Sequence, residues 1–201
     1  MATEAGGRFL LRIEDTDQSR ARWQWEELIY EDLSWLGLAW DTPIKRQSDH
    51  LISYSNPMNL LEERGLIYPC LCRRSDIEAA AGAPQEGVAQ FGPDGRIYPG
   101  SCRHRAMREG RAEDALRLNM RLATEILTEP LLYHETGLDS GPRKVTPEAL
   151  LSQVGDVVLQ RRNGQIAYHL AVVVDDTIQG VSDVVRGNDL AEATQIHVLL
   201  Q

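Results

Sequence analysis

The first third of the chain combines a short apolar run with two segments of helical spacing. Apolar residues crowd positions 8–14, which is typical of a buried strand. Residues 19–36 carry apolar side chains at intervals of three and four, which predicts a helix with one apolar face. A second helix is expected over 49–64. Gly65 would end it, and Pro57 would kink or split it, because proline lacks the amide donor and clashes with the preceding turn.

Strand signals dominate the rest of the chain after a segment without periodicity. Residues 79–101 are rich in Ala, Gly, Pro and Gln, which predicts a mobile surface loop. The valine-rich run 166–174 is nearly continuous and favours a strand buried on both faces, with Asn163-Gly164 as the hairpin turn before it. A helix is expected over 189–201. The strands predicted in this part cover residues 115–121, 155–161, 166–174 and 181–185.

Composition places the chain among ordinary globular proteins. Its 201 residues are 42% hydrophobic and 25% charged, which excludes disorder and collagen-like repeats. No apolar run is long enough to cross a membrane, and residues 1–7 lack the apolar core of a signal peptide. Three cysteines, an odd number without a secretory signal, predict a reducing, cytoplasmic location.

The charge balance bears on nucleic-acid binding. The chain has 21 basic and 30 acidic residues, a net charge of −9, which argues against binding driven by overall charge. One local stretch is basic and remains a candidate for phosphate contacts or, equally, a solvated face. Its arginines are Arg103, Arg105, Arg108, Arg111, Arg117 and Arg121.

The cysteines have a spacing that suits a metal. Cys70 and Cys72 form a C-x-C pair, and Cys102 begins a C-x-H pair with His104 thirty residues later. Zinc prefers thiolate and imidazole ligands in a tetrahedron, often supplied as two short pairs joined by a loop. The three cysteines with His104 or Tyr98 would complete four ligands. The alternative is three unrelated buried cysteines.

Two further groups of polar residues are candidates for binding a charged ligand. Acidic residues follow the strand predicted at 8–14, and a carboxylate there would hold an ammonium group or would simply cap a turn. Tyr168 and Arg186 flank the valine-rich run and the segment after it. The arginine would bind a carboxylate in bidentate fashion or form a surface ion pair with Asp183 or Asp189.

Taken together, these segments resemble glutamyl-tRNA synthetases, which are class I aminoacyl-tRNA synthetases. The similarity is collinear over nearly the whole chain. Two branches of the family compete: the discriminating glutamyl-tRNA synthetases and their shorter paralogues, the glutamyl-Q tRNA(Asp) synthetases. The run from Tyr168 to Val174 and the segment from Arg186 to Leu190 resemble the paralogues more. The segments that carry the resemblance are 7–17, 35–38, 68–72, 98–103, 167–176 and 184–190.

The resemblance implies an α/β fold with three parts. Residues 1–68 would form the first part of a Rossmann-type catalytic domain, residues 69–165 a zinc-bearing insertion, and residues 166–201 the returning part of the catalytic domain. By position, Glu14 would recognise the α-amino group of glutamate. Tyr168 and Arg186 would line the glutamate pocket, with Arg186 on a carboxylate.

The resemblance also implies a particular ligand set for zinc. In the paralogues, two cysteines of a C-x-C pair, a tyrosine and a third cysteine hold the metal, which maps onto Cys70, Cys72, Tyr98 and Cys102. In related synthetases a histidine two residues after the last cysteine serves instead, which here is His104. We therefore predict Tyr98 as the fourth ligand and keep His104 as the alternative.

Neither ATP signature of class I synthetases is found in the 201 residues. No histidine pair has the H-x-G-H spacing, and the two lysines, Lys45 and Lys144, precede Arg186, so neither belongs to a downstream K-x-S-K-like loop. The prediction is that the sequence opens inside the nucleotide fold and closes mid-helix. We assign no catalytic residue and expect this chain alone to be inactive, because in the family that it resembles the activation of glutamate by ATP rests largely on charge stabilisation of the phosphates.

For the complete protein, the resemblance implies ATP-dependent activation of glutamate and its transfer to the queuosine base of tRNA(Asp). The expected partners are tRNA(Asp), L-glutamate and ATP, with magnesium and zinc as metals, no membrane, and a monomeric state. Two alternatives stay open. One is a partial glutamyl-tRNA synthetase that charges tRNA(Glu), and the other is a non-catalytic zinc-containing fragment that binds RNA or a protein.

Overall fold

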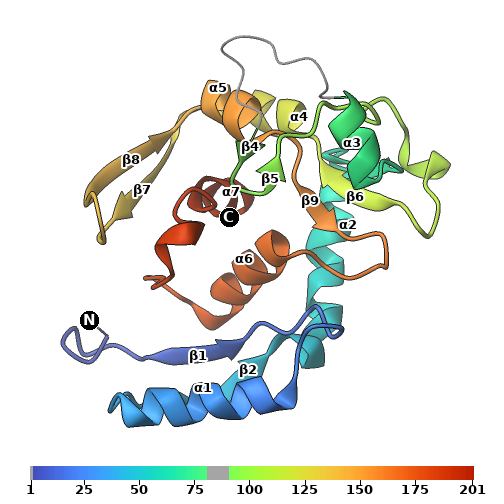
Figure 1. Ribbon diagram of the computed structural model, residues 1–201. Helices are drawn as coiled ribbons and strands as arrows, with labels where there is room; N and C mark the ends of the chain where they lie inside the picture. The colour runs from blue at the N-terminus through green and yellow to red at the C-terminus, as the bar shows by residue number, and fades with distance from the viewer. Residues whose placement is uncertain (1, 81–90) are drawn as a thin grey trace. The chain divides into compact units, whose positions relative to one another are not determined.

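The computed structural model describes residues 2–80 and 91–201 of the chain (Figure 1). The chain forms two compact units, Met1–Ser53 and Tyr54–Gln201. Each unit has its own secondary structure and is described below by itself. The three-part division predicted from the sequence remains a prediction.

The smaller unit is a strand–helix–strand arrangement. Strand β1 (Leu10–Ile13) pairs in parallel with β2 (Asp41–Arg46), and α1 (Trp23–Trp35) connects them. The strand expected at 8–14 and the helix expected at 19–36 are therefore confirmed, the helix beginning four residues later than expected. Gly37 follows α1 with φ 72°, a conformation that glycine adopts without strain and that ends the helix.

A three-stranded antiparallel sheet organises the larger unit. Strand β6 (Ala115–Leu118) lies between β3 (Ile67–Cys70) and β9 (Val158–Gln160). The sequence predicted β6 and β9, although both strands are shorter than expected. The helix expected at 49–64 is split, as Pro57 suggested, into a 3₁₀ segment η1 (Gln47–Tyr54) and α2 (Ser55–Glu63).

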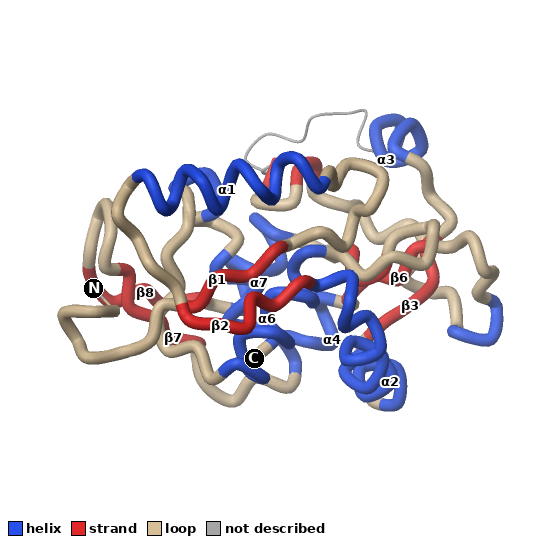
Figure 2. The backbone as a smooth tube through the Cα atoms, turned by 90° about the horizontal axis from the view of Figure 1, so that it is seen from below, coloured by secondary structure: helices blue, strands red, loops and turns tan. Residues whose placement is uncertain are grey.

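The larger unit also contains further helices and two short antiparallel hairpins. In both views the β7–β8 hairpin lies at the opposite end of the unit from the β3–β6 pair (Figures 1 and 2). The elements are α3 (Arg74–Ala80), β4 (Phe91–Gly92), β5 (Gly95–Arg96), η2 (Met107–Glu109), α4 (Met120–Glu125), β7 (Leu131–Glu135), β8 (Gly141–Val145), α5 (Pro147–Ala149), η3 (Leu150–Val154), α6 (Tyr168–Gln179), η4 (Asn188–Leu190) and α7 (Thr194–Leu200).

The strand predicted at 166–174 is wrong, because these residues begin helix α6. The helix runs from Tyr168 to Gln179 and ends at Gly180, whose φ is 65°. All eight residues from His169 to Asp176 are buried. A continuous apolar run has no periodicity that separates a strand from a helix buried on all sides, so the valines suggested the wrong element. The Asn163-Gly164 turn is present before it, with the Gly164 amide bonded to the Arg161 carbonyl at 2.9 Å.

Three other expectations need correction or restriction. Residues 181–185 form no strand, and the helix expected over 189–201 is reduced to η4 and α7. The loop expected at 79–101 lies in part outside the described residues, which omit 81–90. In its described part, α3 extends to Ala80 and a β4–β5 hairpin occupies residues 91–96.

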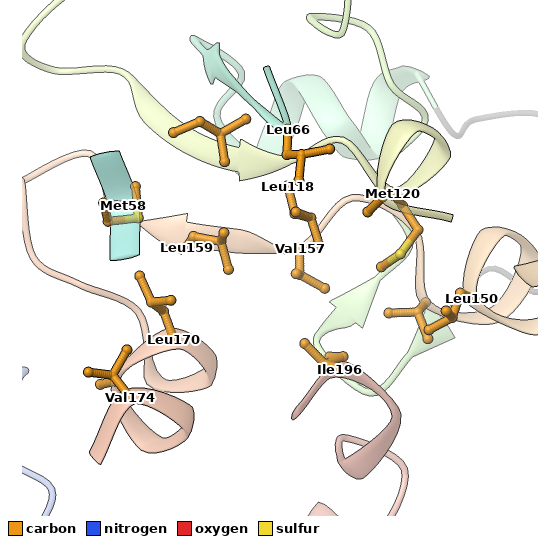
Figure 3. Packing of buried hydrophobic residues seen from close by; sticks show 14 of the residues in the cluster. Met58, Leu66, Leu118, Met120, Leu150, Val157, Leu159, Leu170, Val174 and Ile196 are labelled. Atoms are coloured by element: carbon orange, nitrogen blue, oxygen red, sulfur yellow. The ribbon is translucent and has the colours of Figure 1, made fainter. Parts of the chain in front are cut away.

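The apolar core of the larger unit joins the sheet to its helices. Leu118 and Leu159 come from the sheet, Met58 from α2, Leu170 from α6 and Ile196 from α7, and their side chains converge in Figure 3. This core holds the three strands in register. Among the described residues, no helix is long and apolar enough to span a membrane.

Candidate metal centre and amino-acid site

The four predicted zinc ligands lie together in the larger unit. Cys70 ends β3, Cys72 follows it, and Tyr98 and Cys102 come from the segment after β5. The three sulfur atoms lie within 4.8 Å of one another, and the Sγ atoms of Cys72 and Cys102 are 3.5 Å apart. The Tyr98 hydroxyl oxygen lies 3.4 Å from the Cys70 sulfur and 3.3 Å from the Cys72 sulfur. Four donor atoms thus surround one small volume.

This donor set fits a zinc ion. All three cysteines are free, and Cys70, Tyr98 and Cys102 are buried. With zinc–sulfur bonds of about 2.3 Å, tetrahedral ligands lie about 3.8 Å apart, which is close to the separations found here. His104, the alternative ligand, is exposed and does not belong to the cluster of metal-binding side chains found among the described residues.

The ionisable groups of the cluster differ in how readily they lose a proton. Burial raises the pKa of Cys72 to about 11, and burial with hydrogen bonds to the cysteines raises the pKa of Tyr98. Burial also opposes ionisation of Cys102, but hydrogen bonds outweigh it and lower the pKa of that thiol. The hydrogen bond to Tyr98 is the largest of these, followed by the one to the Leu71 backbone. Because zinc binds the deprotonated forms, metal uptake here releases protons.

Arg117 contacts this cluster and was not identified as part of it from the sequence. It lies in the central strand β6, where it is paired with Tyr68 of β3. Its Nε donates to the Cys70 sulfur at 3.3 Å, and its guanidinium carbon lies 4.1 Å from the centre of the Tyr98 ring. The available signal was a lone arginine in the otherwise apolar run Ala115–Leu118.

Asp156 is the second residue that sequence reasoning missed. Its carboxylate is fully buried and accepts hydrogen bonds from the Tyr68 hydroxyl at 2.5 Å and from Arg103 Nε at 2.7 Å. Its other oxygen accepts from the Met120 amide at 2.9 Å. The Asp156 backbone carbonyl accepts from Arg117 at 2.7 Å. One residue thereby links β3, β6, α4 and the segment that carries Cys102.

Half of the basic stretch, which was a candidate for phosphate contacts or a solvated face, is used inside the protein. Arg103 pairs with Asp156, and Arg117 contacts the cysteine cluster. Arg105 forms an ion pair with Asp114 at 2.8 Å. Arg121 pairs with Glu125 within α4, whereas Arg108 and Arg111 are exposed. A basic surface here is therefore narrower than the sequence suggested.

Arg186, a predicted glutamate-site residue, already binds a carboxylate. Its guanidinium forms an ion pair with Glu135 of β7 at 2.8 Å and donates to the Thr194 hydroxyl at 2.6 Å. The expected surface partners, Asp183 and Asp189, are not those observed. The hydrogen bond from the Gly137 amide and the contact with Arg186 lower the pKa of Glu135. Arg186 thus joins β7 to α7 through a partly buried ion pair and a hydrogen bond.

Tyr168, the second predicted residue, begins α6 and packs against two histidines. Its ring centre lies 5.5 Å from that of His169 and 5.6 Å from that of His197, both in edge-on arrangements. The two imidazoles are joined by an N···N contact of 3.1 Å, and His169 also contacts Asp94 at 3.4 Å. These contacts hold the tyrosine ring in one orientation.

Glu14, the third predicted residue, belongs to the smaller unit. It follows β1 and forms an ion pair with Arg12 at 3.2 Å. Next to it, Asp15 accepts hydrogen bonds from the Ser48 amide at 2.9 Å and hydroxyl at 2.6 Å, which fixes the end of β1. Glu14, Arg12 and Arg46 line an open pocket of about 820 Å³ within this unit.

Comparison with known proteins identifies the family. Residues 1–201 match the family described as tRNA synthetases class I (E and Q), catalytic domain, and the chain belongs to it. A glutamyl-Q tRNA(Asp) synthetase from Rhodobacter capsulatus is 55% identical over the whole chain, which covers 72% of that protein. A protein of the same name from Symbiobacterium thermophilum is 39% identical over 99% of the chain, which covers 61% of it.

Solved structures of glutamate–tRNA ligases share the fold. One from Elizabethkingia meningosepticum, in complex with its amino acid, matches with a TM-score of 0.68 at 23% identity, over 97% of this chain and 40% of that one. The glutamate–tRNA synthetase from Elizabethkingia anophelis matches with a TM-score of 0.69 at 22% identity over the same shares. The α/β catalytic fold of class I synthetases is therefore confirmed.

Proposed function

We propose that this chain is part of a glutamyl-Q tRNA(Asp) synthetase. The complete protein would activate glutamate with ATP and transfer the glutamyl group to the queuosine base of tRNA(Asp). The observation that carries this proposal is the match of the whole chain, at 55% identity, to a relative of that name. Its partners would be L-glutamate, ATP with magnesium, and tRNA(Asp), and it would act as a cytoplasmic monomer.

The roles of the amino-acid site follow from the chemistry of its residues. The Glu14 carboxylate would hold the α-amino group of glutamate, and Tyr168 would line the pocket with its ring. Arg186 would bind a glutamate carboxylate, and its hydrogen bond with the Thr194 hydroxyl supports this role because it holds the planar guanidinium in place. A glutamate molecule bound in this way would have its α-carboxylate free to attack the α-phosphorus of ATP.

We also propose that Cys70, Cys72, Tyr98 and Cys102 hold a structural zinc ion in the insertion, residues 69–165. When bound, the ion would cross-link the end of β3 to the segment that follows β5, which is the usual contribution of a closed four-ligand site. The convergence of three sulfurs and one phenol oxygen supports this ligand set. The surface beside it would face the RNA.

A chimera tests the proposed reaction. The 201 residues would replace the segment that they match in the Rhodobacter capsulatus protein, which then supplies the rest of the chain. We expect the chimera to attach glutamate to queuosine-containing tRNA(Asp) in the presence of ATP. We expect the isolated chain to show no glutamate-dependent exchange of pyrophosphate into ATP, because it contains neither ATP signature.

Two controls separate the alternatives. tRNA(Asp) without queuosine should accept no glutamate, and tRNA(Glu) should remain uncharged. Charging of tRNA(Glu) by the chimera would instead identify a glutamyl-tRNA synthetase. Clear pyrophosphate exchange by the isolated chain would contradict the expectation that it is inactive.

The fourth zinc ligand can be decided with two single substitutions. In the purified chain, Tyr98→Phe should lose most of its zinc, because the phenol oxygen is the donor that contacts two of the sulfurs. His104→Ala should retain it, because His104 is exposed. Zinc content measured by elemental analysis checks both. Retention in Tyr98→Phe with loss in His104→Ala would assign the site to the histidine.

A further inference from the structure

Arg117 is a buried cation that contacts two of the proposed zinc ligands. The residue is only 9% exposed. In the described part of the chain, its guanidinium forms no ion pair with a carboxylate. Its contacts are the Cys70 sulfur, the Tyr98 ring and the Asp156 carbonyl. A buried charge without a counter-ion destabilises a protein, so a compensating anion is expected at this position.

The proposed metal centre is such an anion. A zinc ion has two positive charges, whereas three thiolates and one phenolate supply four negative ones, so the loaded centre is two charges negative. Arg117 contacts two of these four ligands, Cys70 and Tyr98. We propose that Arg117 balances the charge of this centre and positions its ligands, an inference that rests on the zinc site proposed above.

The geometry of β3 and β6 explains why the arginine reaches both ligands. Tyr68 and Cys70 are two residues apart in β3 and point to the same face, and Arg117 lies opposite Tyr68 in the register. The Asp156 carbonyl accepts from Nη1 at 2.7 Å, which leaves Nε directed at the Cys70 sulfur. The contacts of Arg117 in β6 with Cys70 in β3 and with Asp156 thereby fix the plane of the guanidinium against the Tyr98 ring.

Charge balance also gives a reason for tyrosine as a ligand. A phenol is a weaker zinc ligand than an imidazole, and a phenolate adds a negative charge that a neutral imidazole does not. A cation over the face of the ring stabilises that charge. Arg117 occupies this position at 4.1 Å. In the described part of the chain, no cation lies over the exposed His104 as Arg117 lies over the Tyr98 ring.

Metal binding to the full 201-residue chain tests the proposal. Zinc affinity would be measured by competition with a chromophoric chelator, and the ligand set by the absorption spectrum of the cobalt-substituted protein. Arg117→Gln should lower zinc affinity by about 10–100-fold, the usual effect of losing a partner of a metal ligand. Its cobalt spectrum should still show three-sulfur coordination. Arg117→Lys, which keeps the charge, should recover part of the affinity.

Arg121→Gln is the matched control, because it removes another arginine of the same stretch, one that pairs with Glu125 on the exposed surface of α4. It should bind zinc like the unmodified chain. Unchanged affinity in Arg117→Gln would overturn the inference and leave the zinc site standing, whereas absence of zinc from the unmodified chain would overturn the site itself. If Arg117→Gln does not fold, the zinc affinity of Arg117→Lys tests the inference instead. An affinity as low as that of Cys70→Ser would overturn the role of Arg117 in charge balance.

Discussion

Replacing Asp156 with alanine should lower the free energy of unfolding by about 3–5 kcal/mol, because it removes one partner of a buried ion pair. The Asp156 carboxylate is fully buried and accepts from Tyr68, Arg103 and the Met120 amide. Tyr68 and Met120 are themselves buried, so their donors would find no water in its place. Urea denaturation followed by circular dichroism measures the loss.

Two variants calibrate this result. Tyr68→Phe removes a single hydrogen bond to the same carboxylate and should cost about 1 kcal/mol. Asp183→Ala removes an exposed carboxylate whose hydrogen-bond partner in the described part of the chain is its neighbour Ser182, and it should change stability by less than about 0.5 kcal/mol. A loss in Asp156→Ala no larger than in Asp183→Ala would show that the buried network contributes little.

The cluster of three cysteines was expected from the sequence and its sulfur atoms do lie together, while the metal and its full ligand set remain proposals. Two short pairs of ligands separated by a loop are a local pattern, and the pairs Cys70-Cys72 and Cys102-His104 are visible in the linear sequence. Its surroundings were not predictable in the same way. Arg117 reaches Cys70 only through the pairing of β6 with β3, and Asp156 reaches Tyr68 across 88 positions of sequence.

Secondary structure was predicted where periodicity was clear and missed where burial removed it. Helix α1 shows intervals of three and four, and the segment 115–121, which contains β6, alternates apolar and polar residues after Ala115, so both were recognised. Helix α6 is buried over eight consecutive residues and therefore has no polar face to show its period. Gly180, which ends α6 with φ 65°, was the signal that favoured a helix over a strand.

The surroundings of Arg186 show why the partners of a residue cannot be inferred from its sequence neighbours. Sequence neighbours suggested Asp183 or Asp189 as ion-pair partners, but the guanidinium binds Glu135, 51 positions earlier. Side-chain exposure is 17% for Arg186 and 18% for Glu135, so the pair is partly shielded from water. A substrate carboxylate that binds Arg186 must therefore share the guanidinium with Glu135 or displace it.

Arg186 and Glu135 should consequently have opposite effects on glutamate use by the chimera. Arg186→Gln should raise the KM for glutamate by about 100-fold, because a charge-assisted, partly buried contact with a carboxylate is lost. Glu135→Gln should lower that KM several-fold, because it keeps the shape of the side chain but removes the competing negative charge. Steady-state pyrophosphate exchange at varied glutamate concentration measures both.

Glu125→Gln is the matched control for Glu135→Gln, since Glu125 also pairs with an arginine but on the exposed surface of α4. It should leave the KM for glutamate unchanged. A higher KM in Glu135→Gln would show that Glu135 orients Arg186 for the substrate and does not compete with it. An unchanged KM in Arg186→Gln would remove Arg186 from the glutamate site, because the guanidinium would then serve only to join β7 to α7 through Glu135 and Thr194.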